Sequence, residues 1–306
     1  MPNCEKNPEG SGILCINKPS GFTSHDVVNK IRRLYNTKKV GHTGTLDPMA
    51  TGVLILLVGR AVKASEYLMS QKKSYVAGLK LGITSDTEDI SGQILTKSEN
   101  VPPKDEVFAA CDKFVGEIMQ IPPMYSALKV NGKKLVDIAR SGEVIEREAR
   151  PITVHKLEVE CVNEKNGEYL LSVECSKGTY IRTLCADIGA SLGCGGVMSS
   201  LERRENCGFS INHAHTLEEI EALDAESRKD LLIPIEKAFF DYKKLSLAPF
   251  YANLAKNGVK LFASKVSPAA QLGEKFALYE DDKFFAVAEA VLNSDGESVI
   301  RVMKQF

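Results

Sequence analysis

Gly41-His-Thr-Gly-Thr-Leu-Asp-Pro48, which leads through Met-Ala-Thr-Gly52 into the apolar run Val53–Val58, is the most informative stretch of this 306-residue chain. The apolar run predicts a buried strand. The proline biases Asp47 toward an extended backbone, and the glycines permit tight turns and the close approach of another molecule. The stretch therefore predicts a carboxylate presented in a loop beside a strand, with a plain Asp-Pro turn as the structural alternative.

Charge is distributed unevenly along a chain whose formal net charge is only −1. Between residues 18 and 40 six cations face one acid, and between residues 125 and 156 seven cations face four acids. A run with six acids and two cations lies between residues 218 and 230, and a solvated face explains it. Because the whole-chain balance supplies no long-range attraction to phosphate, a nucleic-acid surface must come from local basic segments.

Cysteine, histidine and acidic residues form no familiar metal-binding pattern. The eight cysteines contain no CxxC pair, and His213-x-His215 is the only close histidine couple. In the acidic stretch Asp86–Gly92, Ile90 occupies the position where a calcium loop needs an oxygen ligand. We therefore expect no metal, and we interpret this stretch as a turn.

Neither a secretory signal nor a membrane span is expected. The polar leader lacks an apolar h-region, and no apolar run reaches the roughly 18 residues of a membrane span. Cysteines such as Cys15 and Cys175 lie in apolar stretches, where a reduced thiol behaves as a small hydrophobe. We expect a soluble, cytoplasmic protein with a mobile leader.

Hydrophobic periodicity predicts both helices and strands. The expected helices span residues 24–35 with Ser24 as N-cap, 61–68, 103–119 and 181–192, and a capping box at Thr216–Glu219 opens another. The expected strands span residues 13–16, 53–58, 74–81 and 169–175. From residue 245 onward short apolar segments alternate with turn signals, at 259–262, 276–279, 284–288 and 299–302. This last pattern predicts a small all-β domain or barrel.

Two side chains in these elements are informative. Tyr75 shares the apolar face of its strand with Ala77 and Leu79, so core packing alone would explain it. Arg182 lies in the first turn of its helix, where the helix dipole disfavours a cation by a few tenths to about 1 kcal/mol. We therefore expect an anionic partner for Arg182, with a side chain that extends into solvent as the alternative.

Four motifs in order resemble the bacterial TruB family of tRNA pseudouridine synthases. They are Lys18-Pro-Ser-Gly-Phe-Thr-Ser24, Gly41-His-Thr-Gly-Thr-Leu-Asp-Pro48, Lys73-Ser-Tyr75 and Lys177-Gly-Thr-Tyr-Ile-Arg182. The resemblance extends from about Gly12 to Phe209 and is weaker beyond. It implies an α+β pseudouridine synthase fold in residues 1–244, a mixed, largely antiparallel sheet with flanking helices and a basic RNA-binding insertion at about 123–152. A PUA-like RNA-binding domain is expected at 245–306.

The resemblance also implies an activity, the isomerisation of uridine to pseudouridine at position 55 in the TΨC loop of tRNA. In this family's terms Asp47 is the nucleophile, Arg182 holds it ionised, and Tyr75 stacks on the target base and exchanges a proton with it. The reaction gains no atom and changes no redox state, so no cofactor is expected. Attack at C1′ of the ribose and at C6 of the base both remain open.

Further residues are implied to contact RNA once the base is extruded from its loop. His42 fills the vacated stack, Lys18 and Pro19 line the same cleft, Leu201 packs against the flipped base, and Tyr180 belongs to the substrate-binding motif. One departure from the family pattern is Cys207-Gly208-Phe209, where the glycine and phenylalanine are adjacent. The departure puts only the local geometry near Leu201 in doubt.

The expected partner is the T-stem-loop of tRNA, bound by a monomer that needs no other protein. The basic helix, the insertion and the C-terminal domain are expected to bind phosphates and shape, so affinity should fall with salt. Two alternatives stay open: an RNA-binding or tRNA-folding protein in which catalysis is secondary, and a guide-RNA-dependent synthase. A metal-dependent hydrolase would need further metal ligands beside Asp86, Glu88 and Asp89, and the sequence offers none there.

Overall fold

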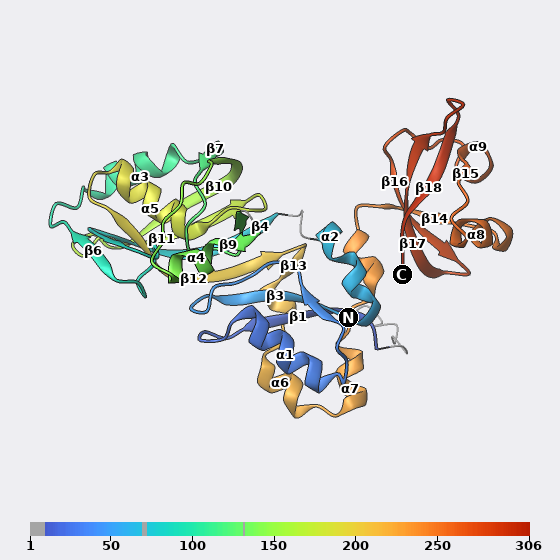
Figure 1. The fold of residues 1–306 in the computed structure, drawn as a ribbon, viewed down its shortest axis with the longest axis horizontal. Helices are drawn as coiled ribbons and strands as arrows, with labels where there is room; N and C mark the ends of the chain where they lie inside the picture. Colours follow the sequence, from blue (N-terminus) through green and yellow to red (C-terminus); the bar gives the residue numbers. More distant parts are fainter. Residues whose placement is uncertain (1–9, 69–71, 131) are drawn as a thin grey trace.

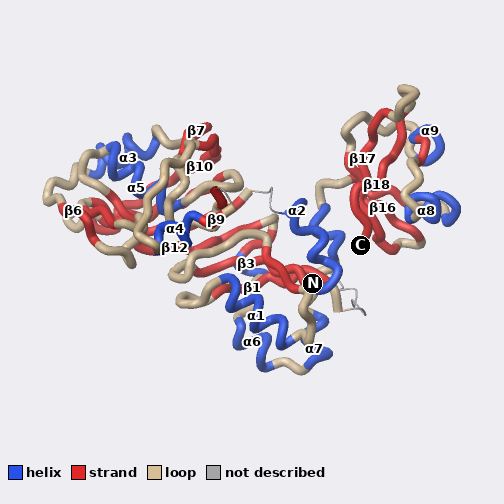
Figure 2. Tube along the Cα trace, in the orientation of Figure 1, coloured by secondary structure: helices blue, strands red, loops and turns tan. Residues whose placement is uncertain are grey.

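The computed structural model describes residues 10–68, 72–130 and 132–306, so the leader expected before Gly10 lies outside it. A nine-stranded sheet forms the body (Figures 1 and 2). Its order is β1 (Gly12–Lys18), β3 (Thr51–Val58), β12 (Gly196–Asn206), β4 (Lys73–Leu81), β11 (Glu168–Cys175), β10 (Arg150–Asn163) and β7 (Gly116–Gln120), with β2 (Val40–His42) paired to β3 and β13 (Phe209–Ser210) to β12. Only the β3–β12 pair in this sheet is parallel among the described strands, so the predicted mixed, largely antiparallel sheet is confirmed.

Alternation along the strands sends side chains to the two faces of this sheet. Leu14 and Ile16 of β1 join a large core with α1 (Ser24–Leu34), α3 (Lys104–Asp112), α5 (Ile181–Ser191) and α6 (Leu217–Ala222). Ile13 and Cys15 join a second core with the 3-10 helices η1 (Gly59–Ala64) and η3 (Ile235–Phe239). The period of two in a strand explains why neighbouring residues serve different layers. The predicted central strands and the helix over 181–192 are confirmed.

A second, five-stranded sheet follows in sequence and lies apart from the first in Figure 1. Its order is β14 (Lys243–Ser246), β16 (Lys275–Glu280), β17 (Lys283–Leu292), β18 (Ser298–Gln305) and β15 (Leu261–Phe262). Helices α8 (Pro249–Lys256) and α9 (Ala263–Val266) accompany it, so the all-β expectation is wrong in this respect. Pro249 occupies the first turn of α8, where its fixed φ favours a helix start.

An aromatic cluster joins this second sheet to the body. The ring of Phe239 lies 5.5 Å from that of Tyr67 and 5.7 Å from that of Phe284 of β17. Lys304 and Glu66 form an ion pair at 2.8 Å beside the cluster. These contacts bury apolar area between the two sheets, which holds them together.

Three expectations about helices differ from the structure. The predicted helix 103–119 ends at Asp112, and residues 116–120 form β7 because Gly116, at φ 107°, turns the chain into the sheet. The N-cap of α1 is Thr23 in a capping box with Asp26, whereas Ser24 is buried and bonds to Leu46. Of the expected helix 61–68, the first part is the 3-10 helix η1 and only α2 (Ser65–Leu68) is α-helical.

Smaller elements complete the fold. They are β5 (Ile83–Ser85), β6 (Ile94–Lys97), β8 (Lys129–Val130), β9 (Lys133–Lys134), α4 (Leu135–Arg140), η2 (Ile211–His213) and α7 (Ala225–Asp230). The capping box at Thr216 opens α6 as predicted. β8, β9 and α4 belong to the basic insertion, while β10 of the main sheet already begins at Arg150. Across the described ranges, none of the helices has the length and apolarity needed to cross a membrane.

Candidate active site

Asp47 lies in the loop between β2 and β3. Lys18 hydrogen-bonds to the backbone of this loop and of the turn after β1. Lys18 Nζ donates to the carbonyl oxygens of Pro19, Phe22 and Pro48 at 2.9, 2.6 and 3.2 Å. Lys18 is fully buried, so it supports the loop and does not line an open cleft as the sequence suggested. Burial lowers the pKa of Lys18 to about 8, and the Asp47 carboxylate opposes that shift.

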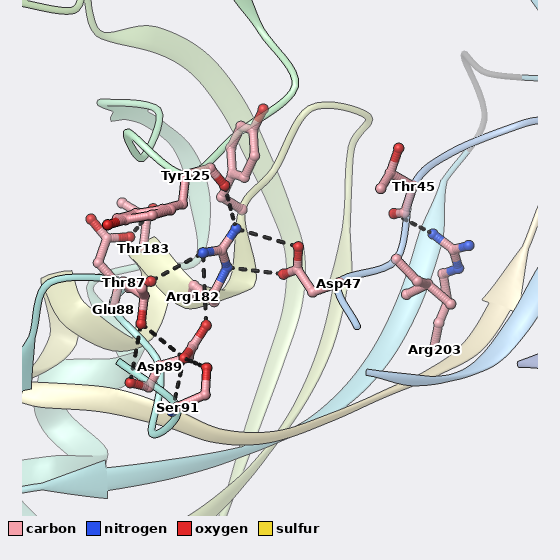
Figure 3. Close-up of polar contacts among 12 residues, drawn as sticks. Thr45, Asp47, Thr87, Glu88, Asp89, Ser91, Tyr125, Arg182, Thr183 and Arg203 are labelled. Carbon is pink, nitrogen blue, oxygen red and sulfur yellow. Dashed lines mark hydrogen bonds and ion pairs between the residues drawn. The ribbon is translucent and has the colours of Figure 1, made fainter. Parts of the chain in front are cut away.

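The partner of Asp47 is Arg182, in the first turn of α5 (Figure 3). Arg182 Nε lies 2.9 Å from Asp47 Oδ2, and Nη2 donates to Oδ1 at 3.4 Å. The side chain of Arg182 is 6% exposed and that of Asp47 is 33% exposed, so the carboxylate faces the surface while the guanidinium lies behind it. The predicted anionic partner of Arg182 is therefore confirmed, and its two-point geometry fixes the carboxylate plane.

Arg182 is held by the backbone on both sides of this ion pair. Its Nη2 donates to the Tyr125 carbonyl at 2.9 Å and its Nη1 to the Thr87 carbonyl at 3.0 Å (Figure 3). Tyr125 lies near the start of the basic insertion, and Thr87 belongs to the turn after β5. The orientation of the guanidinium thus depends on two segments that are distant in sequence from α5.

Asp89 is a second carboxylate at the site, which the sequence analysis missed. Its Oδ2 lies 3.8 Å from Arg182 Nη1, and its Oδ1 accepts from Thr87 Oγ1 and from the Ser91 amide, both at 2.9 Å. The acidic stretch is a turn, as interpreted, and hydrogen bonds within this turn hold the Asp89 carboxylate next to Arg182. An unpaired cation at the start of α5 and an acidic turn were the two available signals.

Burial and neighbouring charges act on Asp47 in opposite directions. Burial raises the pKa of Asp47, Arg182 lowers it, and Asp89 raises it again, with a net upward direction. Arg182 therefore favours the ionised form, as expected, without cancelling the cost of burial.

Tyr75 and His42 are positioned by two strands of the main sheet, β4 and β2. Tyr75 of β4 is 7% exposed within the core, as its strand face predicted, and burial raises the pKa of its hydroxyl. His42 of β2 is half-buried, and its Nδ1 accepts from the Gly44 amide at 3.3 Å. Burial, Arg203 and His25 all lower the pKa of His42, which favours a neutral imidazole.

The other expected site residues differ in how they are placed. Tyr180 immediately precedes α5, and Gln120 fixes its backbone: the Tyr180 amide donates to Gln120 Oε1 at 2.8 Å, and Gln120 Nε2 donates to the Tyr180 carbonyl at 3.0 Å. Leu201 of β12 is buried in the main core. Pro19 is half-buried and contributes its carbonyl to Lys18. Gln120 had no signal in the sequence, because its partner is distant backbone.

Arg203 of β12 is a further buried residue that the sequence analysis missed. Its side chain is 0% exposed and is among the largest that are fully buried. Its position two residues after Leu201 puts both on one face of a strand, and a cation that alternates with core residues was the available signal. Within the described ranges, no group of three or more His, Cys, Asp or Glu residues could hold a metal ion.

Two family models match adjacent parts of the chain. The TruB family pseudouridylate synthase N-terminal domain matches residues 32–181, and the tRNA pseudouridylate synthase B C-terminal domain matches residues 182–239. In a chain with this mixed sheet, these matches define a pseudouridine synthase. Relatives that are 40% and 43% identical over 96% of the chain place it within that class.

Proteins named tRNA pseudouridine synthase B are similar over almost their full length. The one from Alkaliphilus oremlandii is 43% identical over 297 residues, 96% of this chain and 98% of the relative. The one from Clostridium tetani is 40% identical over 295 residues, 96% of this chain and 99% of the relative. The chain belongs to the TruB family of pseudouridine synthases.

Solved structures share the fold. A chain in the crystal structure of a Cbf5-Nop10-Gar1 complex matches with a TM-score of 0.73 and 25% identity, covering 99% of this chain and 92% of that one. A chain in the structure of an H/ACA RNP bound to a substrate RNA containing 2'-deoxyuridine matches with a TM-score of 0.72 at 23% identity, covering 100% of this chain and 92% of that one. The second likeness concerns the fold alone.

Proposed function

We propose that this protein isomerises uridine to pseudouridine in tRNA, at position 55 of the TΨC loop, with Asp47 as the nucleophile. The observation that carries the assignment of the nucleophile is the two-point pair between Arg182 and the Asp47 carboxylate. The similarity to proteins named tRNA pseudouridine synthase B supports the substrate class. The particular loop position rests on the resemblance of the four sequence motifs to the family.

The chemistry requires an ionised carboxylate and little else. The N1–C1′ glycosidic bond breaks, the uracil turns, and a C5–C1′ bond forms, while C5 loses its proton and N1 gains one. The substrate and the product are isomers, so atoms and electrons balance without a co-reactant. Asp47 serves by attack at the ribose C1′ or at the base C6, and Arg182 keeps its carboxylate oriented for either route.

The surrounding residues have complementary roles in this proposal. Tyr75 supports the flipped base and exchanges a proton with it, and Tyr180 and Leu201 bound the same space. His42, whose neutral ring is oriented by the Gly44 amide, occupies the stack that the base leaves. Pro19 lines the entrance, while Lys18 acts from beneath through the loop carbonyls.

RNA binding is assigned to three surfaces of a monomer that acts in the cytoplasm without a protein partner. They are the basic helix α1, the insertion at about 123–152 within a catalytic domain of residues 1–244, and a PUA-like domain of residues 245–306. The five-stranded sheet that begins at Lys243 supports this division of the chain. Contacts through phosphates make the affinity for the T-stem-loop fall as salt rises.

The test replaces Asp47 by Asn, which keeps the size of the side chain and removes its charge. Pseudouridine is mapped by mass spectrometry in unmodified tRNA, and tRNA affinity is measured on the same preparations. We expect the variant to lose isomerisation and to bind tRNA with an affinity within about threefold of the parent, since the carboxylate supplies no attraction to phosphate. Isomerisation retained by Asp47→Asn would contradict the proposal.

A second measurement separates stand-alone action from dependence on a guide RNA. The purified chain alone is incubated with an unmodified T-stem-loop, without any other protein or RNA. Formation of pseudouridine supports stand-alone action. A chain that binds the stem-loop but modifies it only when an accessory RNA is added would assign the protein to the guide-dependent class instead.

A further inference from the structure

Arg203 carries a charge in the middle of the sheet without a carboxylate to balance it. It lies on β12, between β3 and β4, with 0% of its surface exposed. Among the ion pairs formed by residues 10–68, 72–130 and 132–306, none includes Arg203. A buried charge is costly unless hydrogen bonds compensate it, so the groups that surround this guanidinium indicate its purpose.

The compensating groups are carbonyl oxygens on both arms of the Asp47 loop. Arg203 Nη2 donates to the Gly44 carbonyl at 3.1 Å and Nη1 to the Thr45 carbonyl at 3.4 Å, while Nε donates to the Val53 carbonyl at 2.6 Å. Gly44 and Thr45 precede Asp47 and Val53 follows it, so one guanidinium spans the loop. Figure 3 shows Arg203 beside Thr45, on the side of Asp47 away from Arg182.

The backbone of Arg203 is tied to the start of β3, directly after this loop. Arg203 is the parallel β-partner of Gly52, which has φ 97°. A Cβ at Gly52 would lie 2.3 Å from the Arg203 carbonyl oxygen, so only glycine permits this approach. The close contact between β3 and β12 thus fixes the position from which the guanidinium reaches the loop.

Besides the Asp47 loop, Arg203 neighbours Tyr75, the other residue to which a catalytic role is assigned. Tyr75 and Arg203 are direct partners across the antiparallel β4–β12 pair, which places both side chains on one face of the sheet. Burial raises the pKa of the Tyr75 hydroxyl, and the neighbouring Arg203 guanidinium opposes this rise through its charge and through hydrogen bonding to the phenol oxygen. The phenol oxygen is therefore an acceptor toward Arg203, and its own proton is left for another acceptor.

We propose that Arg203 is a positioning residue that holds the Asp47 loop and the Tyr75 hydroxyl as one rigid unit, so that carboxylate and phenol meet the flipped uracil in a fixed geometry. The proposal rests on the proposed isomerisation. Arg203 acts through these groups, because a side chain with no exposed surface reaches neither the phosphates nor the base. A displacement of about 1 Å in a catalytic group can reduce a rate about a hundredfold.

The test compares Arg203→Lys and Arg203→Met with Arg204→Met. Arg204 is the next residue on β12, with a half-exposed side chain paired to Glu202 at 2.9 Å, and it serves as the matched control. We expect Arg203→Lys to lower kcat about tenfold to a hundredfold, with tRNA affinity and KM within about threefold of the parent. We expect Arg203→Met to lower kcat further and Arg204→Met to leave it within about threefold.

Two readouts separate positioning from a purely structural role. Amide hydrogen exchange at residues 44–47 should be faster in Arg203→Lys than in the parent, while exchange in α5 stays unchanged. The effects of Arg203→Lys and Tyr75→Phe on kcat should be less than multiplicative when combined, because both act through the same hydroxyl. Multiplicative effects together with unchanged exchange in the loop would overturn the proposal.

Other outcomes are also decisive. Folded Arg203→Lys with unchanged kcat overturns the positioning role, while activity of the parent chain shows that the proposed isomerisation stands. An inactive parent chain counts against the isomerisation, and loop exchange then decides the role of Arg203 alone. Failure of both Arg203 variants to fold would overturn the proposal, because Arg203 would then be a requirement of the fold.

Discussion

The two sides of the Asp47 loop each contain a buried arginine, and the two are compensated in different ways. On the side of α5, Arg182 faces two carboxylates, those of Asp47 and Asp89. On the side of β12, Arg203 faces neutral carbonyl groups and a tyrosine hydroxyl. The first arginine is therefore coupled to the protonation of its partners, and the second to the shape of the loop.

This difference divides the requirements of catalysis between the two sides. Charge pairs change the pKa of a nucleophile and respond to pH. Hydrogen bonds to backbone carbonyls do not titrate in the working range, so they hold geometry at every pH at which the protein is folded. Variants on the Arg182 side should therefore change the pH profile, and variants on the Arg203 side should change the rate without moving it.

Among variants that leave Asp47 in place, the largest effect is expected for Arg182→Met. Without the two contacts from Arg182, the Asp47 carboxylate is no longer held in one orientation. Because a misplacement of about 1 Å can reduce a rate about a hundredfold, we expect kcat to fall about a hundredfold or more. Arg182→Lys keeps the charge but not the two-point geometry, and it should fall between the parent and Arg182→Met. Single-turnover isomerisation of tRNA measures all three. A kcat for Arg182→Met within threefold of the parent would contradict the assignment.

Lys18→Met tests how much a buried cation that binds backbone carbonyls contributes to the stability of the fold. Three carbonyls lose the donor that Lys18 supplies, and unsatisfied buried acceptors cost about 1–3 kcal/mol each, less where water reaches them. We expect the free energy of unfolding in urea to fall by about 2–4 kcal/mol. Lys38→Met, at an exposed lysine, is the control and should change it by about 0.5 kcal/mol or less. Equal effects of the two variants would refute this role of Lys18.

Much of the Arg182 side could be predicted from the sequence, for a physical reason. A cation in the first turn of a helix is a local anomaly, and it correctly indicated an anionic partner. The apolar run and its glycine-framed aspartate likewise follow from neighbouring residues. Asp89 was missed because an acidic turn looks the same whether it faces solvent or an arginine 93 positions later.

Most of the Arg203 side could not be predicted, because its partners are backbone groups. Which carbonyls surround Arg203 depends on β12 lying between β3 and β4, an arrangement of strands far apart in sequence. The same limit applies to Gln120, which fixes the backbone of Tyr180. The error at 103–119 was similar, since only pairing with β10 shows that residues 116–120 are a strand.

A smaller effect, with a definite direction, is expected for Asp89→Asn. Asp89 raises the pKa of Asp47, so loss of its charge should lower that pKa. Because only ionised Asp47 is a nucleophile, the acid limb of kcat/KM should move to lower pH. The plateau should fall about tenfold or less, since Asn keeps the oxygen that Thr87 and Ser91 contact. A pH series on the parent, Asp89→Asn and Arg203→Lys checks this. If the acid limb of kcat/KM moved as far in Arg203→Lys as in Asp89→Asn, the proposed difference between the two sides of the loop would be wrong.

The smallest effect is expected for Lys30→Met, which removes one member of a surface ion pair. Lys30 of α1 lies 2.7 Å from Glu221 of α6, with side chains 22% and 57% exposed, and such pairs contribute at most about 1 kcal/mol. Because Glu221 already balances the charge of Lys30, removing that charge should leave the slope of log Kd for tRNA against log salt nearly unchanged. Lys129→Met, at an exposed lysine of the insertion, should reduce that slope by about 0.7–0.9 if the lysine neutralises one phosphate. A reduced slope in Lys30→Met would show that RNA displaces Glu221, and that α1 contributes a charge which the free protein keeps paired.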